Sequence, residues 1–126
     1  MKTLLTIIEQ GGYADFTSLY ESLGYEVIKA ESMRKGLSML KNCEPEVITA
    51  EFIYSPMYSA RISNLESLLA ILERKTFIPK LIIFSEPEVQ HQIQRLDMSK
   101  FEADVISYPV TQDKIINILS LEEANN

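Results

Sequence analysis

The side chain best placed for chemistry in this sequence is Glu51, which follows the apolar run from Val47 to Ala50. A run of this kind, introduced here by Pro45, is typical of a strand that is buried on both faces of a parallel sheet. Ligands and reacting groups in such sheets lie outside the carboxyl ends of the strands. A carboxylate there can bind a metal ion or a phosphoryl group if other polar groups converge on it.

The groups that can join Glu51 must come from the ends of neighbouring strands. Apolar runs alternate with segments of helical periodicity, and the expected strands cover residues 3–8, 25–30, 45–52, 80–84 and 103–107. Ser63 with Glu66 and Ser85 with Glu88 have the spacing of capping boxes, which predicts a helix start at each pair. Three other helices are expected to begin near Phe16, Ser32 and Thr111.

The alternation of strands with helices predicts a parallel sheet with helices on both faces. Because right-handed crossovers leave few arrangements, we expect a flavodoxin-like (βα)5 three-layer α/β sandwich. Its five-stranded parallel sheet should have the order 2-1-3-4-5. The length fits a single domain, residues 1–126, with a frayed tail at 122–126.

Composition excludes several classes of partner. The net charge is −6, and residues 86–126 hold eight acidic against three basic side chains. Such a surface repels phosphate backbones, so we expect no nucleic-acid partner. No apolar run approaches the roughly 18 residues of a membrane span, so we expect no membrane partner. The single cysteine, Cys43, and the lack of a secretory signal favour the cytoplasm.

Few other residues offer chemistry. His91 is the only histidine, and one histidine with one cysteine cannot form a zinc site or a catalytic triad. Gly11 and Gly12 lack the spacing of a phosphate-binding loop and are interpreted as a turn. We therefore expect no metal, no cofactor and no enzymatic activity.

With this order of elements, the chain resembles the receiver domain of bacterial response regulators over nearly its full length. The resemblance rests on Leu-Gly-Tyr-Glu-Val at 23–27, Pro-Glu-Val-Ile at 45–48, Ile-Ile-Phe-Ser at 82–85 and Tyr-Pro at 108–109. It implies a role in two-component signal transduction or a phosphorelay.

The resemblance also implies a site. Receivers accept a phosphoryl group on an aspartate after the third strand, hold magnesium with an acidic pair after the first, and contact the phosphoryl group with a hydroxyl and a lysine. Here the phosphoacceptor position holds Glu51, the hydroxyl position keeps Ser85, and the lysine position holds Tyr108.

The acidic pair falls on Ile7 and Ile8, or on Ile8 and Glu9 if the first loop is one residue shorter. Isoleucine offers no oxygen to magnesium, and without the lysine a dianionic group is poorly neutralised. We therefore interpret the chain as a degenerate receiver, or pseudo-receiver, that is not switched by aspartyl phosphorylation. Glu51 is then either a mimic of the phosphorylated residue or a relic, solvated or hydrogen-bonded at the strand end.

The segment after this strand has the composition of an interface. Phe52, Tyr54, Met57, Tyr58 and Arg61 are of residue types that are enriched where proteins meet. The alternative is that this loop folds over the remnant of the site. The partner would be another protein or a second copy of this chain, bound through this loop or through the face of the last two helices.

The leading hypothesis is a stand-alone, non-enzymatic pseudo-receiver that signals through protein contacts. One alternative is an atypical response regulator in which Glu9 and Glu51 grip a metal ion and Ser85 contacts a phosphoryl group. The other is a flavodoxin-like binder of a small ligand, which requires an open pocket at the strand ends.

Overall fold

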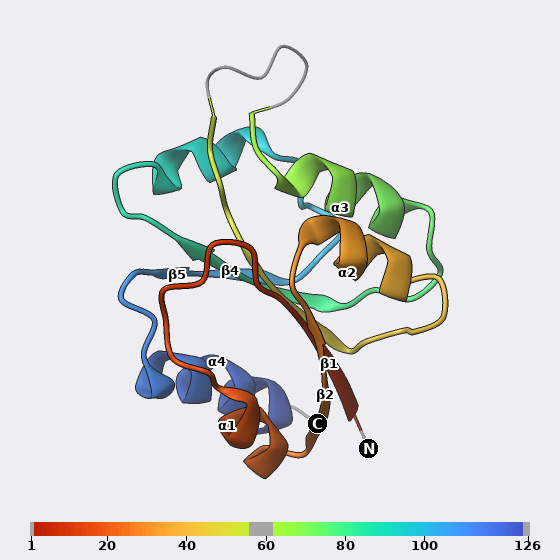
Figure 1. Ribbon diagram of the computed structural model, residues 1–126, viewed down its shortest axis with the longest axis vertical. Coiled ribbons are helices and arrows are strands. Elements are labelled where there is room, and N and C mark those ends of the chain that lie inside the picture. The colour runs from red at the N-terminus through yellow and green to blue at the C-terminus, as the bar shows by residue number, and fades with distance from the viewer. Residues whose placement is uncertain (1, 56–61, 125–126) are drawn as a thin grey trace.

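The computed structural model describes residues 2–55 and 62–124 and contains one parallel sheet (Figure 1). Its strand order is β2-β1-β3-β4-β5, which confirms the predicted flavodoxin-like fold class and topology. The strands are β1 (Lys2–Ile7), β2 (Tyr25–Ala30), β3 (Val47–Glu51), β4 (Lys80–Ser85) and β5 (Ala103–Ser107).

Helices cover both faces of the sheet, as Figure 1 shows. On one face lie α1 (Thr17–Ser22) and α4 (Gln112–Ala124). On the other lie α2 (Met33–Met39), α3 (Leu65–Glu73) and the 3-10 helix η1 (Gln90–Arg95). None of the helices in the described part of the chain is long and apolar enough to cross a membrane.

Side chains from alternating positions of the strands pack into two separate hydrophobic cores, one on each face of the sheet. Leu5 and Ile48 pack beneath α2 and α3, whereas Leu4 and Val47 pack beneath α1 and α4. This follows from the two-residue period of a strand, which sends neighbouring side chains to opposite faces. All residues of β3 and β4 are buried, so the two strands hold their carboxyl ends rigidly at the same edge of the sheet.

The helix predicted to start near Ser63 is present, and α3 begins at Leu65 with Asn64 as its N-cap. The Ser63 N–H donates to the Glu66 carboxylate at 3.0 Å, and the Ser63 hydroxyl accepts from the Leu65 N–H at 3.1 Å. Ser32 likewise accepts from the Lys35 N–H at 3.1 Å and caps α2. These bonds satisfy N–H groups that have no partner within the first helical turn.

The predicted capping box at Ser85 is wrong. Ser85 is the last residue of β4, is fully buried, and donates its hydroxyl hydrogen to the Glu86 carbonyl at 3.0 Å. Strand pairing with β5 therefore overrides the local helix signal, and the short η1 starts only at Gln90. At the other end of the chain, α4 runs to Ala124. The last two residues of the tail predicted at 122–126 lie outside the described residues.

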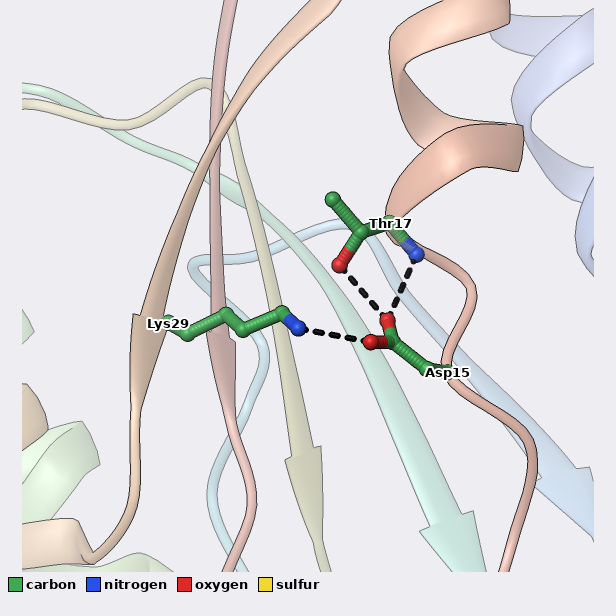
Figure 2. A network of polar contacts seen from close by, with 3 residues as sticks. All are labelled: Asp15, Thr17 and Lys29. Carbon is green, nitrogen blue, oxygen red and sulfur yellow. Dashed lines mark hydrogen bonds and ion pairs between the residues drawn. The ribbon is translucent and has the colours of Figure 1, made fainter.

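A polar network attaches the loop after β1 to β2 (Figure 2). One oxygen of Asp15 accepts from the Thr17 N–H at 2.9 Å and from its hydroxyl at 2.6 Å. The other oxygen pairs with the Lys29 ammonium at 2.7 Å. The bonds to Lys29 and then Thr17 hold the pKa of the Asp15 carboxyl below its usual range. Because both charged groups are exposed, this pair positions the loop more than it stabilises the fold.

The close approach of α2 to β1 depends on Gly36. A Cβ atom at this position would lie 2.7 Å from Cδ1 and 2.9 Å from Cγ1 of the buried Ile7. In an open helix, Gly to Ala raises stability by about 1 kcal/mol. Here we expect overpacking to prevail, so that Gly36→Ala lowers the free energy of unfolding by about 1–2 kcal/mol in urea denaturation.

Ser38→Ala is the matched control, because Ser38 is an exposed residue of the same helix. It should be neutral or slightly stabilising. A Gly36→Ala variant as stable as Ser38→Ala would mean that Ile7 moves aside without cost.

Candidate functional site

Glu51 is buried and fully hydrogen-bonded. Its side chain is at the end of β3, and the residue is only 1% exposed. The carboxylate accepts from the backbone N–H groups of Glu9 at 3.0 Å, Gln10 at 2.8 Å and Gly11 at 3.3 Å. It also accepts from the Tyr13 hydroxyl at 2.7 Å. The two oxygens thus receive four hydrogen bonds, all from the loop after β1.

The glycines allow this loop to aim its N–H groups at one point. Gly11 has a φ of 70° and Gly12 a φ of 87°, in the left-handed region that favours glycine. Successive N–H groups in such a turn form a concavity that binds an anion. The Glu51 carboxylate is therefore held as an internal anion by the loop. We call this arrangement the Glu51 nest, formed by the backbone of 9–11 and the Tyr13 hydroxyl.

Asn64 ties the nest to the start of α3. Its side-chain amide donates to the Glu9 carboxylate at 2.6 Å and to the Glu51 carbonyl at 2.7 Å. Its side-chain oxygen accepts from the Ile53 N–H at 2.7 Å. One amide thus joins the end of β1, the end of β3 and the segment that leaves β3. The carboxylate of Glu9 is therefore already hydrogen-bonded to the Asn64 amide.

Ser85 and Tyr108 lie at the same edge but make no hydrogen bond to Glu51. The Ser85 hydroxyl donates to the Glu86 carbonyl, as described above. The Tyr108 ring stacks on Tyr13, with ring centroids 6.2 Å apart. Burial, followed by the charges of Glu51 and Glu86, raises the pKa of Tyr108 to about 12. Burial and the bond to Glu51 raise the pKa of Tyr13 above its ordinary value as well.

Solved structures of receiver domains share this architecture. The chain aligns with the receiver domain of the Francisella response regulator 1452 at 18% identity and TM-score 0.70, over 96% of this chain and 95% of that one. It aligns with a receiver protein from Sinorhizobium medicae at 15% identity and TM-score 0.72, over 95% and 92%. The chain has the fold of response-regulator receiver domains.

A third solved structure aligns with the whole chain. The regulatory domain of the repressor of iron transport regulator, in its inactive form, aligns at 16% identity and TM-score 0.73 over 100% of this chain and 98% of that one. No family model and no curated protein sequence matches. The likeness to receivers therefore lies in the fold, and the residues of the site have to be judged individually.

The residues at the receiver metal position do not fit a magnesium ion. Ile7 is fully buried in the core, and Ile8 offers no oxygen ligand. The carboxylate of Glu9 is bound by Asn64, and that of Glu51 by the nest. Among the described residues, no three acidic, histidine or cysteine side chains are grouped so as to hold a metal ion.

The two described aromatic residues of the predicted interaction segment differ in burial. Phe52 is 4% exposed and belongs to the core beneath α3, so its expected place in a contact surface is wrong. Tyr54 is half-buried, stacks on Phe52 with ring centroids 6.4 Å apart, and pairs with Ser63 in an antiparallel bridge. The other predicted residues, Met57, Tyr58 and Arg61, lie outside the described residues.

Two residues of the site were missed by sequence reasoning. Tyr13 stands in the loop after β1, where no spacing or periodicity marks it as a partner of Glu51. Asn64 lies between Ser63 and Glu66 of the predicted capping box, and nothing in the sequence links it to Glu51. A usable signal for the nest was the Gly11–Gly12 pair opposite a strand-end acid, since glycines with positive φ build anion-binding turns. The spacing of that pair alone indicates only a turn.

The nest predicts a large stability effect for Glu51. Glu51→Ala leaves the buried donors of the loop without an acceptor, so we expect the free energy of unfolding to fall by about 2–4 kcal/mol. Glu51→Asp should also destabilise, by a smaller amount, because its carboxylate stops one methylene short of the loop. Urea denaturation followed by circular dichroism measures both.

Glu44→Ala is the control for loss of an acidic side chain, since Glu44 is exposed in the loop before β3. It should change stability by less than about 0.5 kcal/mol. Equal effects at the two positions would contradict a structural role of the Glu51 carboxylate.

Proposed function

We propose that this protein is a pseudo-receiver, a signalling domain that is not switched by aspartyl phosphorylation and acts through contacts with other proteins. The observation that carries the proposal is the Glu51 nest. In a receiver fold, the strand-end acid is the group that must react, and here its oxygens are committed to the loop after β1.

The chemistry of phosphoryl transfer supports this reading. The reaction needs an attacking oxygen in line with the phosphoryl group and cations that neutralise its charge. Glu51 is 1% exposed and points its carboxylate into a ring of donors, so an attacking oxygen would have to break hydrogen bonds first. The magnesium position holds Ile7 and Ile8, or Ile8 and Glu9, and the Glu9 carboxylate is already bound by the Asn64 amide. The lysine position holds Tyr108.

The same geometry argues against two other roles for Glu51. A residual phosphoacceptor would need Glu9, Glu51 and Ser85 to turn toward a shared ligand, yet each is hydrogen-bonded elsewhere. A mimic of a phosphorylated residue would need to engage the hydroxyl of Ser85, which instead donates to the Glu86 carbonyl. A structural acid that fixes the loop is the role that fits its contacts.

Phosphorylation independence is tested by incubation with magnesium and acetyl phosphate, or with beryllofluoride. We expect no gain of mass and no movement of the amide resonances of residues 9–13 and 51, because neither the metal nor the phosphoryl group has a site. The Glu51→Asp variant is the matched control and should be equally inert, since Ile7 and Tyr108 remain. A magnesium-dependent phosphoryl adduct on the wild-type protein would refute the proposal.

The protein-contact part of the proposal is tested at Tyr54. If the segment after β3 forms the contact, Tyr54→Ala should weaken self-association in sedimentation velocity, with little change in the circular dichroism spectrum. Ile78→Ala serves as control, because this 59% exposed side chain lies before β4, at the opposite end of the sheet. Self-association that survives Tyr54→Ala unchanged would leave this segment as a cover over the strand end.

A further inference from the structure

A pocket of about 460 Å³ lies beside the Glu51 nest, at the carboxyl ends of the strands. It is formed by the loop after β1 and by the connection between β5 and α4. Its volume falls within the roughly 300–1,000 Å³ range of small-molecule sites. Its lining includes Gly11, Gly12, Tyr13, Glu86, Tyr108 and Val110. A small-ligand binder with this fold needs an open pocket at the strand ends, and this pocket meets that need.

Two tyrosine rings give the pocket aromatic walls. Tyr13 and Tyr108 stack with an interplanar angle of 25° and both line the pocket. Tyr13 is fixed from two sides, by its hydroxyl bond to Glu51 and by an edge contact with the buried Phe84 ring at 5.1 Å. The rings are therefore part of the folded framework. Aromatic rings attract cations that approach their faces.

The charge around the pocket is negative. Glu86 lines it, and Tyr13, another lining residue, donates its hydroxyl hydrogen to the Glu51 carboxylate. Burial, followed by the charges of Glu51 and Glu86, raises the pKa of Tyr108. No cationic side chain is among the lining residues. The nearby ammonium of Lys114 is held by the carbonyls of Pro109 at 2.9 Å and Ser107 at 3.2 Å, from the side of α4.

We propose that this pocket binds a small organic cation of the quaternary ammonium or guanidinium class, held against Tyr13 and Tyr108 and paired with Glu86. Aromatic walls with an adjacent carboxylate are a favourable setting for such cations. An inorganic phosphate or a phosphoryl ligand is repelled by the same carboxylates. The proposal does not depend on the signalling role proposed above.

Choline is the probe for a free ammonium ligand. In a titration of the intact protein followed by amide resonances, choline should give saturable shifts at Gly11, Gly12 and Val110. Its uncharged carbon isostere, 3,3-dimethyl-1-butanol, should give much smaller shifts, and inorganic phosphate none. Equal binding of choline and the isostere, or no saturable shift with any cation, would overturn the proposal.

Two substitutions locate the site. Glu86→Gln should weaken choline binding by about three- to tenfold, because it removes the paired charge and keeps the shape. Tyr108→Leu should weaken it by at least about threefold, because it removes one aromatic wall. Glu88→Gln, at an exposed acid outside the pocket lining, should leave binding unchanged. Identical affinities for Glu86→Gln and Glu88→Gln would contradict the assignment.

N-acetyl-arginine amide distinguishes the source of the cation. Tighter binding of this probe than of choline would support capture of an arginine side chain from a partner. Tighter binding of choline would support a free ammonium compound. Either result keeps the assignment to a cation, and failure of both probes removes it. A phosphorylation result on the same protein is independent, since it reports on Glu51 and not on this pocket.

Discussion

A carboxylate that is buried at the end of a strand must be matched by hydrogen-bond donors, and this requirement organises one edge of the molecule. Leaving such a charge unpaired would cost several kcal/mol, so the loop after β1 must close over Glu51 for the fold to be stable. The closure sets the backbone of Gly11 and Gly12 and the position of the Tyr13 ring. Through Asn64 it also fixes where α3 begins.

The nest also changes the electrostatic character of the strand ends. In receivers, as the family resemblance implies, this edge gathers cations around an anionic phosphoryl group. Here the anion is internal, the lysine position holds Tyr108, and Glu86 adds a further negative charge beside the pocket. The fold is that of receiver domains, whereas the charge beside this pocket favours a ligand of positive sign.

Much of the fold could be predicted from sequence, because buried parallel strands leave continuous apolar runs. The runs at 25–30 and 103–107 match β2 and β5. The predicted helix start at Ser85 was wrong because the Ser-Glu-Pro-Glu signal at 85–88 is local, whereas Ser85 pairs with Ser107 of β5. The position of Glu51 was also predictable, since it follows from the strand. Its partners were not, because three of its four donors are backbone N–H groups, which every residue but proline carries.

The two outer strands carry charged side chains at positions that face water. Glu26 and Lys29 lie on β2, and Asp104 lies on β5, where it pairs with Lys80 at 2.8 Å. An open sheet has unpaired backbone groups along both margins, which can add strands from other molecules and nucleate aggregates. Charges on these margins make such addition unfavourable, because they would be desolvated against a neighbour. Growth of the sheet from molecule to molecule is therefore disfavoured, and any stable association has to use the helical layers or the loops.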